Sequence, residues 1–247
     1  TQVRFIRDFY SDRYTHLQAD LVVSRHVLEH SPAPHELLGQ LRRATGDRLD
    51  TVVFFEVPNV LYTLRDLGIW DIIYEHVSYF SPGSLAQAFR GSGFESLRLG
   101  EEFGGQYLTI EARPARTEQN EPPAWEGLAD MARLVSDFAG SYRQKLAAWG
   151  ERLERARRLG QKAVVWSAGS KGVSFLNVFK DSGIEWVIDV NPRKHGRFIP
   201  GAGQEIRSPA FLQTYRPDLV FVMNPIYAAE IEAMAAGYGL RPEFIQV

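Results

Sequence analysis

Hydrophobic residues along this chain fall into two patterns that predict strands and helices in turn. Short apolar runs rich in β-branched and aromatic residues are typical of buried strands. In the first half of the chain such runs occur at 19–24, 51–57, 94–99 and 106–112. Between them, residues 34–44 and 84–92 carry apolar side chains at helical spacing, and Gly93 ends the second helix. The pattern predicts an α/β arrangement.

The composition changes after the last of these runs. Residues 114–123 are polar and rich in proline, which predicts a linker. Residues 125–159 then follow a helical period, with an apolar face that contains Leu128, Met131, Leu134, Val135 and Phe138. This stretch is long for a single helix without a bend, so we expect a helical connector.

The remainder of the chain returns to alternating strands and helices. Predicted strands lie at 163–166, 184–189, 218–223 and 244–247, and predicted helices at 173–179 and 227–237. This alternation predicts a parallel sheet with helices on both faces. In such sheets, ligands bind beyond the carboxyl ends of the strands, so the turns there are the first places to look for chemistry.

Composition narrows the possible functions. The chain has 247 residues, no cysteine and a formal net charge of −2. Without cysteine there is no disulfide and no thiolate metal site in this chain, which fits a reducing cytoplasm. No apolar stretch approaches the ~20 residues of a membrane span, and the first 20 residues do not resemble a signal peptide. The near-neutral charge gives no reason to expect nucleic acid as a partner. The Arg- and Glu-rich stretch 151–158 reads as a solvated helix face.

A dense group of proton-transfer side chains lies at Tyr74, Glu75, His76 and Tyr79. A glutamate beside a histidine can accept or hold a proton near neutral pH, as general base catalysis requires. The alternative is a half-buried strand or turn whose histidine caps a backbone group.

A second candidate follows the strand at 19–24. His26, Glu29 and His30 could indicate a metal, because the two histidines are four residues apart. The segment has no HExxH pattern, however, so a strand-to-helix crossover lined with polar groups is the preferred interpretation, and no metal is predicted.

A third candidate is the turn Gly169, Ser170, Lys171 and Gly172, which opens a helix. Backbone amides in such a turn can hold a phosphate group, and a tight turn without a ligand is the alternative. Asp189 and Asn191 follow the next strand, where an acid can bind a ribose or simply form a turn.

Together these segments resemble the class I sugar C-methyltransferases, which use S-adenosylmethionine. Residues 19–29 resemble the fourth strand and following turn of that fold, residues 70–81 resemble the family's Tyr-x-Glu-His-x-x-Tyr-Phe-Ser segment, and residues 161–247 resemble its C-terminal domain. The family's first tyrosine in that segment falls at Ile73, and Tyr74 is the adjacent phenol.

The resemblance implies a partial methyltransferase sheet followed by a second Rossmann-like α/β domain. It assigns 1–115 to the C-terminal half of the methyltransferase domain, 116–160 to a linker and helical connector, and 161–247 to the C-terminal domain. The family's cysteine-rich zinc domain and glycine-rich cofactor loop are not found in these residues. The chain therefore resembles the C-terminal two-thirds of a family member, with an incomplete cofactor site.

The resemblance also implies roles for individual residues. His76 would be the base that removes a proton from a ring carbon of a nucleotide-linked keto sugar, with Glu75, Tyr74 and Tyr79 beside it. Arg25 and His26 would lie near S-adenosylmethionine. The substrate would contact six residues: Gly169, Ser170, Lys171, Gly172, Asp189 and Asn191.

Two other functions remain open at this point. A methyltransferase that acts on oxygen or nitrogen would need no carbon-acid base, so the residues around His76 would only bind substrate. A non-catalytic module would bind nucleotide sugars through the C-terminal domain alone.

Overall fold

The computed structural model describes residues 3–116 and 127–247, which belong to two compact units. The first unit contains Thr1–Tyr62 and Tyr74–Arg133, and the second contains Thr63–Ile73 and Leu134–Val247. Packing therefore divides the chain differently from the ranges predicted along the sequence. The segment Thr63–Ile73 joins the C-terminal unit because the Trp70 ring lies 5.1 Å from the Phe175 ring in its core. Part of the predicted linker, residues 117–126, lies outside the described residues.

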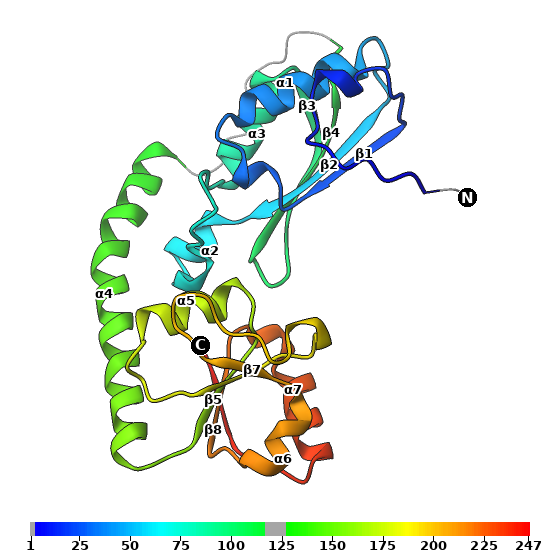
Figure 1. Ribbon diagram of the computed structural model, residues 1–247. Helices are drawn as coiled ribbons and strands as arrows, with labels where there is room; N and C mark the ends of the chain where they lie inside the picture. Colours follow the sequence, from blue (N-terminus) through cyan, green and yellow to red (C-terminus); the bar gives the residue numbers. More distant parts are fainter. Residues whose placement is uncertain (1–2, 117–126) are drawn as a thin grey trace. The chain divides into compact units, whose positions relative to one another are not determined.

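The first unit is built on a mixed sheet (Figure 1). Its strands are β1 (Leu21–Arg25), β2 (Val52–Pro58), β3 (Phe94–Glu102) and β4 (Tyr107–Pro114), in the order β1-β2-β4-β3. β1 and β2 are parallel, whereas β4 runs antiparallel to both of its neighbours. This mixed sheet is consistent with the class I methyltransferase fold that the resemblance implies.

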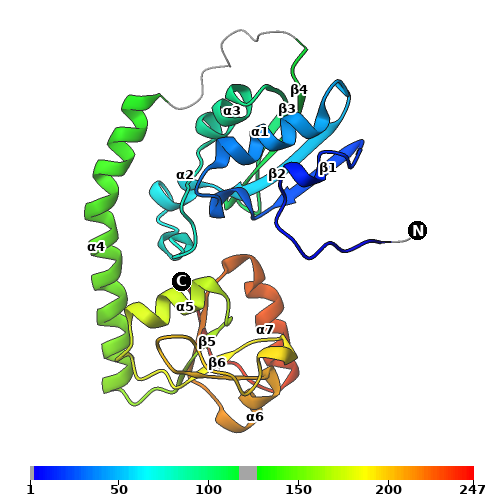
Figure 2. The same cartoon turned by 45° about the horizontal axis from the view of Figure 1, so that its top comes forward.

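Two helices cover the same face of this sheet (Figure 2). They are α1 (Pro34–Thr45) and α3 (Pro82–Gly91), and α2 (Val60–Leu64) is a single short turn. Alternate residues of β2 and β4 point to the helices, among them the buried Phe55 and Ile110. α3 starts at Pro82, two residues before the predicted helix, and Ser81 and Ser84 form a capping box at this end.

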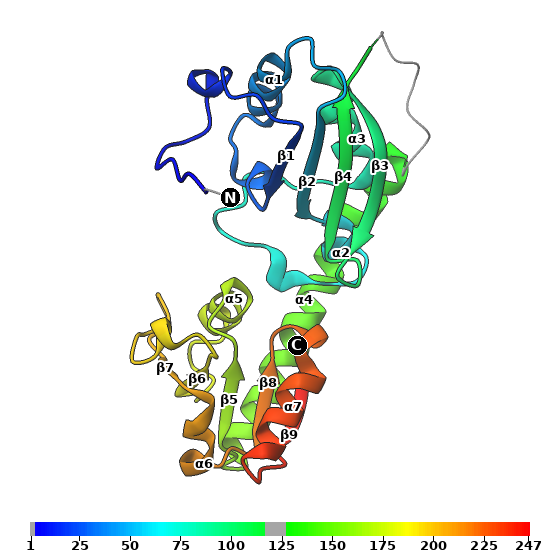
Figure 3. The same ribbon diagram turned by 90° about the vertical axis from the view of Figure 1, so that its right-hand side faces the viewer.

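The second unit is a parallel sheet with the order β7-β6-β5-β8-β9 (Figure 3). The strands are β5 (Ala163–Trp166), β6 (Trp186–Ile188), β7 (Glu205–Arg207), β8 (Leu219–Val222) and β9 (Glu243–Gln246). The sequence pattern missed β7, because three residues with charged ends show no apolar run. Every residue of β5 and β8 is buried, as expected for central strands covered on both faces.

The two faces of this sheet carry separate apolar clusters. One contains residues of α4 (Leu128–Arg158) and α5 (Ser170–Val178), and the other contains residues of α6 (Leu212–Tyr215) and α7 (Ala228–Gly237). α4 is one continuous helix of 31 residues, so the expected bend does not divide it. In the described part of the chain, no helix combines the length and apolar character that a membrane crossing requires.

Candidate functional sites

The segment that carries His76 is fastened to the 3-10 helix η2 (Leu28–His30), which follows β1. The backbone amides of Val77 and Ser78 both donate to the carbonyl oxygen of Glu29, at 3.0 and 3.1 Å. In return, Nδ1 of His30 lies 2.9 Å from the carbonyl oxygen of Glu75. Three hydrogen bonds therefore hold two segments together that are far apart in the sequence.

The four predicted catalytic side chains do not form one cluster. The rings of His76 and Tyr79 meet edge to face, with centroids 6.1 Å apart. Tyr74 is 98% exposed and the Glu75 side chain is also exposed. Burial lowers the pKa of His76, and the neighbouring His30 lowers it further, so the neutral imidazole predominates at neutral pH. Its Nδ1 is buried and has no hydrogen-bond partner among the described residues.

Beside His76 lies a buried carboxylate, Glu29, with an exposed fraction of 1%. Neither of its side-chain oxygens has a hydrogen-bond partner in the described part of the chain. The closest imidazole nitrogens are Nδ1 of His26 at 3.4 Å and Nε2 of His30 at 3.9 Å, both measured to Oε1. Burial raises the pKa of Glu29, although both imidazoles counteract this effect.

The two residues predicted near the cofactor share one acid at the carboxyl ends of β1 and β2. Nε and Nη2 of Arg25 donate to Oε1 of Glu56 at 3.0 and 2.8 Å, and Nε2 of His26 lies 2.9 Å from the same oxygen. His26 has a φ of +53°, a left-handed conformation that non-glycine residues rarely adopt. The chain turns sharply there, which directs the imidazole toward Tyr107, with ring centroids 4.7 Å apart.

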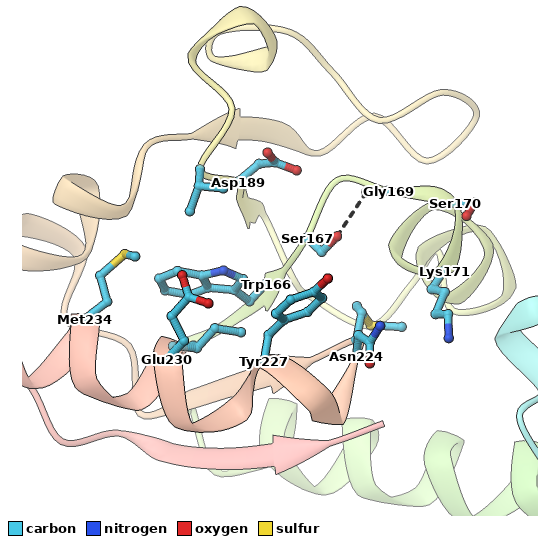
Figure 4. A pocket seen from close by; sticks show the side chains of 13 residues that line it. Trp166, Ser167, Gly169, Ser170, Lys171, Asp189, Asn224, Tyr227, Glu230 and Met234 are labelled. Carbon is cyan, nitrogen blue, oxygen red and sulfur yellow. Dashed lines mark hydrogen bonds between the residues drawn. The ribbon is translucent and has the colours of Figure 1, made fainter. Parts of the chain in front are cut away.

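A pocket of about 450 Å³ lies in the second unit (Figure 4). The ends of β5, β6 and β8 contribute Trp166, Asp189 and Met223 to its lining, and α7 with the turn before it contributes Tyr227, Glu230 and Met234. β5 and β8 are the first and fourth strands of this sheet yet lie side by side. The pocket therefore occupies the switch point at which parallel sheets bind their ligands.

Three residues of the predicted phosphate turn, Gly169, Ser170 and Lys171, line this pocket. The turn is strained, because Ser167 has a φ of +112°, and its Oγ accepts a hydrogen bond from the amide of Gly169 at 3.2 Å (Figure 4). Gly172 has a packing role, since a Cβ there would lie 2.1 Å from the carbonyl oxygen of Ser167.

The charge of Lys171 is neutralised within the second unit. Its Nζ donates to Oδ2 of Asp71 at 2.9 Å, and both side chains are largely buried. Burial raises the pKa of Asp71, while Lys171 acts in the opposite direction. Because Lys171 is paired with Asp71, an anionic ligand in the pocket would contact the backbone amides at the start of α5 rather than the Lys171 ammonium.

Asp189 lines the pocket, but its carboxylate is already used. Oδ2 accepts hydrogen bonds from the amide of Ala168 and from Nζ of Lys194, both at 2.9 Å, and Oδ1 accepts one from the amide of Asn191 at 2.8 Å. The side chain of Asn191 caps a short turn by accepting from the amide of Arg193. Both residues therefore form the turn after β6.

Sequence reasoning missed several pocket residues, chiefly Trp166, Asn224 and Tyr227. Trp166 ends a predicted strand, and Asn224-Pro225 is a turn signal directly after another. Applying the rule for carboxyl ends to every strand would have found both. Tyr227 carries no such signal, because it reaches the pocket from the turn before α7.

A mixed α/β sheet and a second, parallel α/β unit are consistent with a class I methyltransferase fold, and two family models match the chain. Residues 118–242 match the model of the C-methyltransferase C-terminal domain, and residues 2–99 match that of a methyltransferase domain. The chain belongs to the C-methyltransferase family that this C-terminal domain defines.

A curated relative agrees with this assignment. The C-methyltransferase NovU of Streptomyces niveus is 28% identical over 228 residues, which cover 87% of this chain and 54% of NovU. The chain thus spans about half the length of that curated relative. A solved structure described as RSP in complex with beta-NADH is 19% identical. The match covers 47% of this chain and 73% of the chain in that structure. Its TM-score of 0.28 is too low to support an argument about fold or ligand.

Proposed function

We propose that this chain is part of an S-adenosylmethionine-dependent methyltransferase that methylates a carbon next to the keto group of a nucleotide-linked sugar. The reaction would pass through an enolate. Membership of the C-methyltransferase family supports transfer to carbon. The observation that carries the proposal is the position of His76, which three hydrogen bonds between η2 and residues 75–78 hold beside the turn that follows β1.

In this proposal, His76 removes the proton from the ring carbon next to the keto group. The electron pair of the broken C–H bond becomes the enolate, and the proton stays on the imidazole. Tyr79 packs on His76 and limits its rotation. Glu75 and Tyr74 are exposed and would contact substrate rather than hold the base.

When bound, S-adenosylmethionine would supply the electrophilic methyl group that the enolate carbon takes up. Among the residues of this chain, Arg25 and His26 would contact it. Both lie at the carboxyl end of β1, where this fold class binds ligands, and both side chains are partly exposed. Because Glu56 already pairs with each of them, they fit a contact with a neutral part of the cofactor.

The pocket of the second unit would bind the nucleotide group of the substrate. Trp166 and Tyr227 offer aromatic surface for a base, and the backbone amides at the N-terminus of α5 can donate to phosphate oxygens. Asp189 would take part through the shape of its turn and not as a ribose ligand, since its oxygens are occupied.

The test uses the full-length protein that contains this chain. Incubation of a nucleotide-linked keto sugar in D₂O without cofactor should exchange the ring proton next to the keto group, and His76→Ala should abolish that exchange. Methyl transfer should fall by about 10²–10⁴-fold, the usual contribution of a general base. Affinity for S-adenosylmethionine should stay unchanged, and His35→Ala, on the exposed surface of α1, should behave as wild type.

Two results would contradict the proposal. Methyl transfer without any proton exchange would favour transfer to oxygen or nitrogen. Binding of nucleotide sugars without methyl transfer would favour a non-catalytic module.

A further inference from the structure

Three side chains that commonly bind metals meet in the first unit. One ligand atom each from Glu29, His30 and His76 lies within 4.8 Å of the other two. They come from η2 and from the segment after residue 73, so tertiary structure alone brings them together. The sequence-based candidate set contained His26 in place of His76.

The tautomer of His30 suits a metal ligand. Its Nδ1 faces the carbonyl oxygen of Glu75 at 2.9 Å, and a carbonyl oxygen can only accept, so Nδ1 carries the hydrogen. In the neutral ring, Nε2 then holds the lone pair, and this atom lies 3.9 Å from Oε1 of Glu29. A histidine that donates its second nitrogen to a backbone carbonyl is the usual arrangement at metal sites.

The buried carboxylate of Glu29 gives an independent indication of a cation-binding site. Only 1% of the Glu29 surface is exposed. Neither carboxylate oxygen has a hydrogen-bond partner within the described residues. Burial of such a group is costly unless it is paired or coordinates a metal. Nδ1 of His76 is likewise buried without a partner in the described structure.

We propose that Glu29, His30 and His76 form a binding site for a divalent first-row transition metal such as Zn²⁺. Two imidazoles and one carboxylate favour zinc, cobalt or nickel over magnesium and calcium, which prefer oxygen ligands. Tetrahedral ligands around zinc lie about 3.4 Å apart, so ligand atoms that are up to 4.8 Å apart would close by about 1.4 Å at most. His30 is 42% exposed on its side chain, which leaves a path for the ion.

His26 is not a member of this site. Its Nε2 lies 2.9 Å from Glu56, which also binds Arg25, so its ring is held by a different acid. Its Nδ1 is near Glu29 at 3.4 Å, and its replacement is therefore a stringent control.

A consequence rests on the proposed function: an imidazole nitrogen bound to metal cannot also accept a proton. Zinc in this site would therefore inhibit proton abstraction by His76. The metal site itself does not depend on that function, and its test measures binding directly.

Isothermal titration of Zn²⁺ into the 247-residue chain, after treatment with a chelator, tests the site. We expect one ion per chain, with affinity reduced at least tenfold in Glu29→Gln, His30→Asn and His76→Asn. His26→Asn and His35→Asn should bind as wild type, and Mg²⁺ at the same concentration should not compete. Far-UV circular dichroism identifies any variant that fails to fold, and Glu29→Gln is close in shape to the native side chain.

Absence of binding to wild type would overturn the proposal, as would equal binding in the three ligand variants. A loss confined to one of these variants would overturn the three-residue set. Competition by Mg²⁺ would overturn the assignment to a transition metal. If zinc binds as expected but does not slow proton exchange from the sugar, the metal site stands and the role of His76 as base fails.

Discussion

Nδ1 of His30 donates to the backbone carbonyl oxygen of Glu75, 45 residues later in the chain, at 2.9 Å. This bond, with the two amides that donate to the carbonyl of Glu29, defines where His76 lies in the first unit. Neither partner is unusual in the sequence. Because the His30 side chain bonds to a backbone oxygen, it holds the segment in place without requiring a particular side chain there.

Removal of this bond should loosen the segment locally. A hydrogen bond contributes about 1 kcal/mol, so His30→Ala should speed amide exchange of Val77 and Ser78 about fivefold. Hydrogen exchange followed by mass spectrometry or NMR measures the effect. His35→Ala should leave these amides protected, and unchanged exchange in His30→Ala would show that the Glu29 carbonyl alone holds the segment.

The ion pair between Asp71 and Lys171 should be costly to break from one side. Asp71→Asn keeps the shape but leaves the Lys171 ammonium buried without that carboxylate, at a cost of about 3 kcal/mol in free energy of unfolding. Urea unfolding monitored by tryptophan fluorescence measures this. The exposed pair Arg65–Asp66 provides the control, because Asp66→Asn should cost less than about 1 kcal/mol. Equal losses would indicate that the buried pair is solvated in solution.

Gly172 should tolerate no side chain. A Cβ at this position would lie 2.1 Å from the carbonyl oxygen of Ser167, so Gly172→Ala should destabilise the second unit by about 1–3 kcal/mol. The matched change Gly140→Ala, in the interior of α4, meets no atom within 4 Å and should stabilise by about 0.5–1 kcal/mol. Midpoints of urea unfolding compare the two. An unchanged unfolding midpoint in Gly172→Ala would mean that the turn at Ser167 relaxes readily.

The second unit should lose stability in acid through Asp189. Burial alone raises the pKa of this carboxyl, but hydrogen bonds from the Asn191 amide, Lys194 and the Ala168 amide together hold the pKa below its usual value. The carboxylate therefore stabilises the fold fully above the pKa of the unfolded chain, and this contribution disappears as pH falls through the folded pKa.

Asp189→Asn should accordingly be less stable than wild type near neutral pH, and the difference should shrink as pH falls below the usual pKa of a carboxyl group. Urea unfolding at a series of pH values provides the measurement. Asp181→Asn, at an exposed position, controls for the change in net charge. A difference that stays constant with pH would exclude a titrating carboxylate as its source.

The proposed binding of a nucleotide in the pocket of the second unit should depend on Tyr227. Loss of one stacking ring costs about 1–3 kcal/mol, so Tyr227→Ala should weaken binding of a nucleoside diphosphate about tenfold or more. Quenching of tryptophan fluorescence reports binding, because Trp166 lines the same pocket. Phe198→Ala removes an exposed ring that does not line the pocket and should have no effect. Equal affinities of Tyr227→Ala and wild type would show that the nucleotide does not bind against Tyr227.

The sequence by itself determined the class of fold and most of its strands and helices, but not β7. Runs such as 51–57 and 218–223 became β2 and β8, because only strands buried on a sheet favour such dense β-branched and aromatic residues. It also determined the order of the two α/β regions and placed Gly169, Ser170 and Lys171 in the turn after a strand, where they line the pocket of the second unit. Local spacing is sufficient for these features, since each depends on neighbours within about ten residues.

Tertiary structure alone decided which side chains meet. Asp71 pairs with Lys171 across 100 residues, and His76 reaches Glu29 and His30 across more than 40, distances at which sequence periodicity carries no information. It also decided that the carboxylate of Asp189 accepts a hydrogen bond from the Asn191 amide in the turn after β6. The carboxylate of Glu29, in contrast, is buried without a hydrogen-bond partner among the described residues. The physical reason is that burial and pairing are properties of the packed chain: the same carboxylate is inert or reactive according to what surrounds it.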